Sequence, residues 1–150
     1  MSLHQDWLAI LPKAIWAWTG RAHAFGEADC VVFVRDVLLA IGAKDPLPDG
    51  ITWSTPRGAA RVLRRVGGIA AQLARVYPEI ELSQLRSGDV LALEASDDQP
   101  MGAVYIVQGS RAWSILENDG HGPGGLLSED LALLVANPAN WRAFSVQGLG

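Results

Sequence analysis

The sequence predicts an α+β fold in which N-terminal helices pack on a small antiparallel sheet. In its first half, apolar residues recur at helical spacing between residues that cap helices. In its second half, short apolar and β-branched runs alternate with turn residues, as expected for neighbouring strands. The chain has 150 residues, of which 49% are hydrophobic, enough for one well-packed domain spanning residues 1–150.

Residues 2–18 are predicted to form the first helix. Their large apolar side chains recur at three-to-four spacing, namely Trp7, Leu8, Leu11, Ile15, Trp16 and Trp18. Pro12 lies inside the pattern and is expected to split or kink the helix. Residues 1–24 would thus be a helical extension. Its tryptophans pack in the core on one interpretation and form a partner surface on the other.

The next segment holds the only cysteine of the chain. Asp29 is predicted to cap a buried helix that starts at Cys30 and stops at Gly42. A thiol in the first turn faces the positive end of the helix dipole, which lowers its pKa and favours the nucleophilic thiolate. The alternative is a small buried hydrophobic residue without chemistry.

Two further helices are predicted over residues 57–66 and 69–76, with a glycine pair between them. Thr55 and Pro56 are the start signal of the first. Four arginines of the first of these are expected to form a solvated helix face: Arg57, Arg61, Arg64 and Arg65. The remaining predicted elements are strands over residues 90–93, 102–107, 112–116 and 141–146, a glycine-rich loop over 118–125, and a short helix over 128–135.

Composition excludes several classes of protein. The net charge of −4 and the otherwise scattered basic residues argue against a nucleic-acid binder. One cysteine excludes an internal disulfide and cysteine-based zinc sites, and no cofactor is expected. There is no apolar run of membrane-spanning length and no recognisable signal peptide, so we expect synthesis and folding in a cytoplasm.

Two motifs together resemble a known family. Phe25-Gly26 followed by Asp29-Cys30, and Gly88-Asp89-Val90-Leu91 at the start of the sheet, are similar to segments of the NlpC-like, papain-like cell-wall cysteine peptidases. A small phage-associated branch looks closer still, because it joins the cysteine segment to an Arg-Gly-Ala-x-Arg-x-Leu helix, here residues 57–63, and to a Gly-Gly pair. The resemblance covers residues 25–144 and implies a papain-like fold with Cys30 as nucleophile.

The sequence departs from that family at the general base. The resemblance places a catalytic histidine at the start of the second strand, but residues 101–107 contain none. Amide hydrolysis needs such a group to take the thiol proton and later to protonate the leaving amine. His23 and His121 are the candidate replacements, whereas His4 is expected to face solvent from the first helix.

His121 lies in the glycine-rich loop, where Asp119 and Glu117 are close enough in sequence to orient it; a plain exposed loop histidine is the alternative. The same three residues offer only a weak metal site, because no regular element fixes them.

Two functions follow. The first is a structural component of a phage tail or tail tip, a pseudoenzyme with a degenerate NlpC-like fold. It would be made in the host cytoplasm, incorporated into the virion and held by other tail proteins or by copies of itself. The second is an active cysteine peptidase or amidase that cleaves peptidoglycan peptides, with Cys30 as nucleophile and His121 or His23 as base. The missing histidine favours the first.

Overall fold

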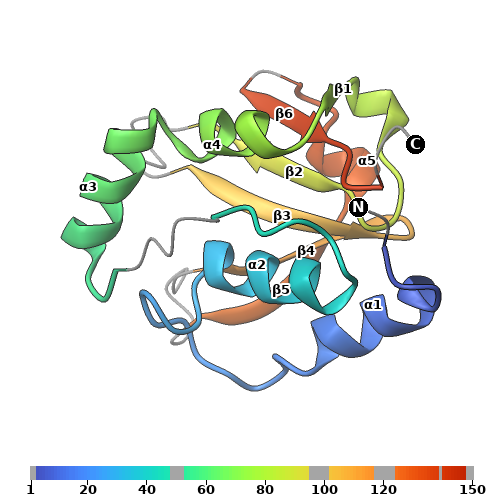
Figure 1. Cartoon of the computed structure of the whole chain (residues 1–150), viewed down its shortest axis with the longest axis horizontal. Helices are drawn as coiled ribbons and strands as arrows, with labels where there is room; N and C mark the ends of the chain where they lie inside the picture. The colour runs from blue at the N-terminus through green and yellow to red at the C-terminus, as the bar shows by residue number, and fades with distance from the viewer. Residues whose placement is uncertain (1–2, 48–52, 95–101, 117–123, 139, 148–150) are drawn as a thin grey trace.

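The structure, a computed structural model of the whole chain, describes residues 3–47, 53–94, 102–116, 124–138 and 140–147. It has α+β architecture, with helices packed on an antiparallel sheet (Figure 1). The order of helices followed by strands therefore predicted the fold class correctly.

The sheet has the strand order β1-β6-β2-β3-β4-β5, and each neighbouring pair is antiparallel. The strands are β1 (Glu79–Ile80), β2 (Val90–Leu93), β3 (Ala103–Gln108), β4 (Arg111–Leu116), β5 (Gly125–Asp130) and β6 (Trp141–Phe144). The central strands β2 and β3 are buried almost throughout, which explains their continuous apolar sequences.

The helices are α1 (Trp7–Trp16), α2 (Cys30–Ala40), α3 (Pro56–Val66), α4 (Ile69–Val76) and α5 (Leu131–Leu134), with a single 3₁₀ turn, η1 (Leu82–Gln84). The predicted capping residues occupy their predicted places. Thr55 Oγ1 accepts a hydrogen bond from the Gly58 N–H at 2.9 Å, and Gly42 adopts the left-handed conformation (φ +87°) after α2.

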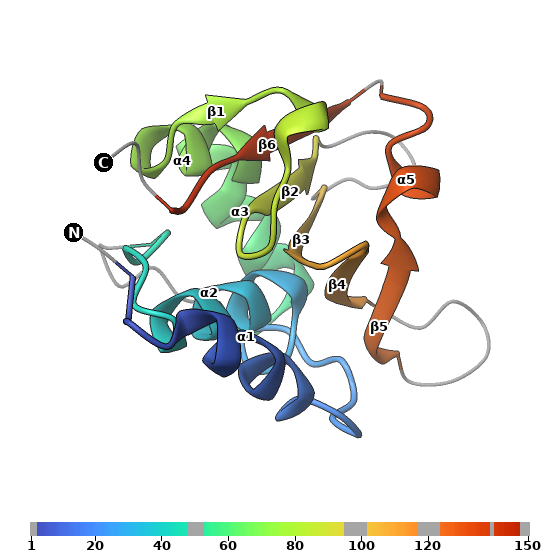
Figure 2. The same cartoon turned by 90° about the vertical axis from the view of Figure 1, so that its right-hand side faces the viewer.

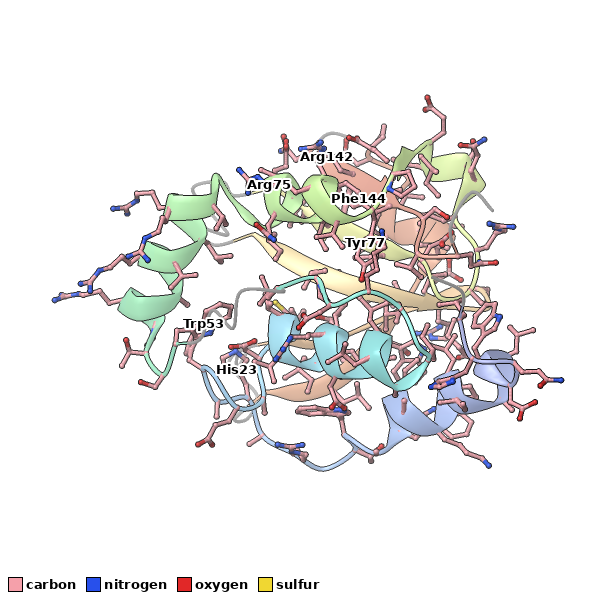
Figure 3. The ribbon with its side chains drawn as sticks, viewed as in Figure 1. His23, Trp53, Arg75, Tyr77, Arg142 and Phe144 are labelled. Atoms are coloured by element: carbon pink, nitrogen blue, oxygen red, sulfur yellow. The ribbon has the colours of Figure 1, made fainter. Side chains whose placement is uncertain are left out.

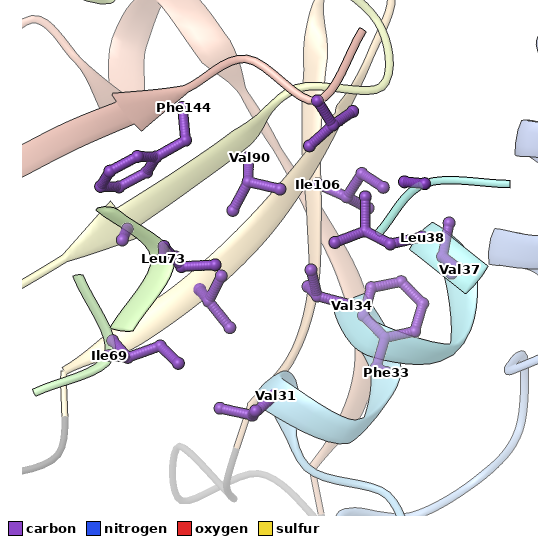
Figure 4. Close-up of a cluster of buried hydrophobic side chains, with 14 of the residues drawn as sticks. Val31, Phe33, Val34, Val37, Leu38, Ile69, Leu73, Val90, Ile106 and Phe144 are labelled. Atoms are coloured by element: carbon purple, nitrogen blue, oxygen red, sulfur yellow. The ribbon is translucent and has the colours of Figure 1, made fainter. Parts of the chain in front are cut away.

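Helix α2 forms the centre of the main core. Its buried side chains Val34 and Leu38 point towards the sheet, near Ile106 of β3 (Figure 4), and Phe33 lies edge-on to Trp18 with 5.8 Å between the ring centroids. Helix α1 packs on the other side of α2 through Leu11 and Ile15, which are almost fully buried. Burying these side chains is the main source of stability for the fold.

The opposite face of the sheet carries a smaller apolar cluster. Leu91, Tyr105 and Ala112 are buried there beneath the η1 and α5 regions. Figure 2 shows the resulting layers, with α1 and α2 on one side of the sheet and α5 on the other.

The Gly88-Asp89 pair starts the sheet as a turn. Asp89 is fully buried and accepts hydrogen bonds from the backbone N–H groups of Arg86 at 3.0 Å and Val146 at 3.3 Å. Burial raises the pKa of its carboxyl group above the usual value. The Gly88-Asp89 motif thus has a structural role, because Asp89 joins the turn to the C-terminal segment.

The first helix is shorter than predicted. It begins at Trp7 instead of residue 2, because the preceding segment is fixed to α2 by a hydrogen bond from the His4 N–H to the Ile41 carbonyl at 2.9 Å. The helix also continues through Pro12, so the proline does not split it. Proline at this position removes only one backbone hydrogen bond, to the carbonyl of the exposed Leu8.

The prediction for residues 128–135 was wrong in its first part. Residues 125–130 form β5, which pairs with β4 along its whole length, and the helix starts only at Leu131. Ser128-Glu129-Asp130 has the composition of a helix start, but only Asp130 serves as one, by accepting a hydrogen bond from the Leu133 N–H at 3.1 Å. The glycine-rich loop predicted over residues 118–125 lies largely outside the described residues.

Among the described residues, no helix combines the length and the apolar character needed to cross a bilayer.

Candidate functional site at the start of helix α2

Asp29 organises the start of α2. It is the N-cap of the helix, and its Oδ1 accepts a hydrogen bond from the Val32 N–H at 2.8 Å. Its Oδ2 accepts two more, from the Gly26 N–H at 2.8 Å and from Trp53 Nε1 at 2.7 Å. The carboxylate is 4% exposed, and these three donors compensate for its burial.

Gly26 is required by this arrangement. The chain turns tightly between Ala24 and Ala28, whose backbones form an isolated antiparallel bridge, and Gly26 lies in the turn at φ +80°. A Cβ atom on Gly26 would lie 1.7 Å from the carbonyl oxygen of Trp53. The aromatic-glycine motif before the cysteine therefore allows two backbone segments to approach each other closely.

Cys30 is the first residue of α2 and packs against the main core as a partly buried side chain. Burial raises the pKa of its thiol to about 12, and the neighbouring Asp29 carboxylate adds to the increase. Backbone N–H groups of Val104 on β3, and of the helix start itself, act in the opposite direction.

Burial therefore outweighs the pKa-lowering effect of the helix start on the Cys30 thiol. These surroundings favour the protonated thiol, and the nucleophilic role of Cys30 stays a prediction.

Neither described histidine is hydrogen-bonded to the thiol. His23 is half-buried and lies edge-on to the Phe25 ring, with 4.7 Å between the ring centroids. No hydrogen bond joins His23 to Cys30 in the described part of the chain, and no histidine contributes to the shifted pKa of the thiol. Figure 3 shows His23 and Trp53 near the start of α2.

His4 precedes α1, where we expected it inside the helix, although it is exposed as predicted. A Cβ atom on Gly42 would lie 3.3 Å from the His4 ring, so this histidine lies beside the C-terminal end of α2. The helix has 11 residues and a length of about 16 Å, which separates His4 from Cys30.

His121, Asp119 and Glu117 lie outside the described residues, so their role as a base with orienting groups stays a prediction. Within the described segments, no group of three or more histidine, cysteine, aspartate or glutamate residues is placed to hold a metal ion.

Trp53 is the residue of this site that the sequence did not identify. It follows a proline- and glycine-containing loop, and we expected most tryptophans to contribute to core and helix packing. Its indole N–H is a donor that needs a partner when buried. The one available signal was Asp29, because its carboxylate can accept more hydrogen bonds than a helix cap alone requires.

The comparisons with known proteins give a family without an assigned activity. The sequence pattern of the family described as "Domain of unknown function (DUF6950)" matches residues 2–131. A search of curated proteins finds no match to this chain.

Proposed function

The chain belongs to the family described as a domain of unknown function (DUF6950), and we propose that it is a structural component of a phage tail or tail tip. Because that description names no activity, the function is argued from the chain's own residues. In this proposal an NlpC-like fold is kept without hydrolysis. The phage assignment rests on the similarity of the Cys30 segment and of residues 57–63 to a small phage-associated branch of the NlpC-like peptidases.

The observation that carries the proposal is the state of the Cys30 thiol. Its pKa is raised to about 12, mainly by burial, so the thiolate fraction near pH 7 is negligible. An active cysteine peptidase lowers this pKa with a neighbouring cation and needs an imidazole to protonate the leaving amine. Here the charged group that shifts the thiol pKa is the Asp29 carboxylate, which raises it.

The position of the start of α2 beside β3 supports the proposal of a papain-like fold. The start of α2 lies against Val104, near the beginning of β3, which is the strand where the resemblance places the catalytic histidine. The described residues at that point are apolar, with Ala103 and Val104 almost fully buried. In this proposal the fold retains the contact between α2 and β3 but lacks the catalytic imidazole.

The proposal is tested by complementation in a phage whose copy of this gene is deleted. Wild-type protein and Cys30→Ala should restore particle assembly and infectivity equally, and mass spectrometry should find both in purified particles. Purified protein should leave muropeptides intact.

Cys30→Ser, which preserves the size of the side chain, controls for a packing defect in the alanine variant. Muropeptide cleavage by the wild type that is lost in Cys30→Ala would instead establish the peptidase with His121 or His23 as base.

A further inference from the structure

Charge is distributed very unevenly along this chain. The segment from Gly50 to Pro78 contains five arginines and no aspartate or glutamate, whereas the rest of the chain contains seven basic and sixteen acidic residues. The segment therefore carries a charge of +5 and the remainder a charge of −9, which the modest total of −4 conceals. This separation concentrates the positive charge on α3 and α4.

The arginines of α3 lie on its exposed side. Arg57, Arg61 and Arg65 are spaced four residues apart and thus follow one face of the helix over about 12 Å, with Arg64 beside them. The opposite side packs inward through Ala59 and Leu63. None of these four arginines forms an ion pair among the described residues, in contrast to Arg35 and Arg142.

Arg75 of α4 extends the same surface. A Cβ atom on Gly67, which ends α3, would lie 4.0 Å from Arg75 Nη2, so this guanidinium lies beside the last turn of α3. Figure 1 shows α3 projecting beyond the sheet at one edge of the molecule, where a partner can approach it. We call these five residues the arginine face: Arg57, Arg61, Arg64, Arg65 and Arg75.

We propose that the arginine face binds the acidic surface of a second copy of this chain. This deepens the proposed function, on which it rests, by naming the partner of a structural subunit. Guanidinium groups bind carboxylates through paired hydrogen bonds. The acidic surface of the described remainder includes the exposed Asp6, Glu27, Asp36, Glu81 and Glu129.

The symmetry of the contact follows from the sign of the charge. A twofold axis through the arginine face would place it against itself, and two positive surfaces repel each other. The contact therefore joins the arginine face of one copy to carboxylates of another, either reciprocally about a twofold axis between the two patches or head-to-tail. Head-to-tail contacts produce rings when the rotation closes and filaments when it does not.

Sedimentation velocity over a range of protein concentrations tests the proposal. At 50 mM NaCl the wild type should form oligomers, and at 500 mM NaCl these should dissociate because salt screens the charges. Arg61→Glu with Arg65→Glu should weaken the association by about tenfold or more. Lys13→Glu, a charge reversal at an exposed position of α1, is the matched control and should associate like the wild type.

A mixing experiment identifies the head-to-tail geometry. The double variant keeps its acidic surface, so when it is added to wild-type protein it should cap growing oligomers and shorten them. Circular dichroism should show the wild-type helix content for the double variant, and Arg61→Gln with Arg65→Gln provides a second, milder variant.

A wild type that remains monomeric at 50 mM NaCl would overturn the proposal, as would oligomers that the arginine substitutions leave unchanged. Binding of a duplex DNA oligonucleotide by monomeric protein, lost in the double variant, would assign the face to nucleic acid instead. None of these results depends on the state of the Cys30 thiol, so the proposed function is tested separately.

Discussion

At the scale of single residues, Asp29 shows how one side chain positions several others. Its two oxygens hold the first turn of α2, the turn at Gly26 and the indole of Trp53, which come from three separate stretches of the chain. The same carboxylate raises the pKa of the adjacent thiol. Asp29 therefore acts as a structural residue that joins these segments by hydrogen bonds.

Substitution of Gly26 by alanine tests this close packing. Gly26→Ala should destabilise the protein strongly, because the new methyl group would lie 1.7 Å from the Trp53 carbonyl oxygen in a left-handed backbone conformation. Gly20→Ala is the matched control, since Gly20 has nearly the same φ (+84°) but no atom within 4 Å of its Cβ position.

Chemical denaturation measures both variants. The control should lose about 1–2 kcal/mol of unfolding free energy from backbone strain alone, and Gly26→Ala should lose about 1–3 kcal/mol more from overpacking. Equal losses in the two variants would show that the contact with Trp53 is relieved without cost.

At the scale of helices and strands, local signals predicted the elements that local interactions fix. Helix α3 starts and ends where Thr55 and Gly67 indicate, because a cap and a left-handed residue act within one turn. Strand β5 was missed because its existence depends on pairing with β4, and no local signal outweighed the helix-like Ser128-Glu129-Asp130. The cap at Asp29 was predictable, but its bond to Trp53, 24 residues away, was not.

Helix α2 is joined to the segment that follows it by an ion pair that we expect to be sensitive to acid. Arg35 donates two hydrogen bonds to the Asp45 carboxylate, at 2.8 and 2.7 Å, and this holds the pKa of Asp45 below its usual value. A carboxyl group whose pKa is lowered by folding stabilises the protein above its unfolded pKa of about 4. This contribution is lost as the pH falls through the folded pKa.

Asp45→Asn should therefore lower the free energy of unfolding at pH 7 by about 0.5–1 kcal/mol, a small value because both side chains are partly exposed. The difference from wild type should shrink as the pH falls below about 4 in urea denaturation curves. Glu27→Gln, at an exposed position, is the control. A loss for Asp45→Asn that is equally large at pH 2.5 would show that charge is not its cause.

At the scale of the whole molecule, three elements meet near the start of α2. Helix α2 brings Cys30, the segment before α3 brings Trp53, and β3 brings the backbone of Val104. The sequence predicted two of these contributors, the cysteine segment and the strand, from their motifs. It did not predict that the thiol pKa would rise, because burial depends on how distant segments pack around the sulfur.

The central claim is that this packing keeps the Cys30 thiol protonated and unreactive. The alkylation rate of the thiol as a function of pH tests this claim most directly. Cys30 is the only cysteine, so the modification reports on it alone. With iodoacetamide, the folded protein should react slowly and show no plateau up to pH 10, since its thiol pKa is raised to about 12. The same protein unfolded in urea should show a half-maximal rate near the ordinary cysteine pKa of about 8.5. A folded protein that reaches its maximal rate below pH 8 would contradict the account.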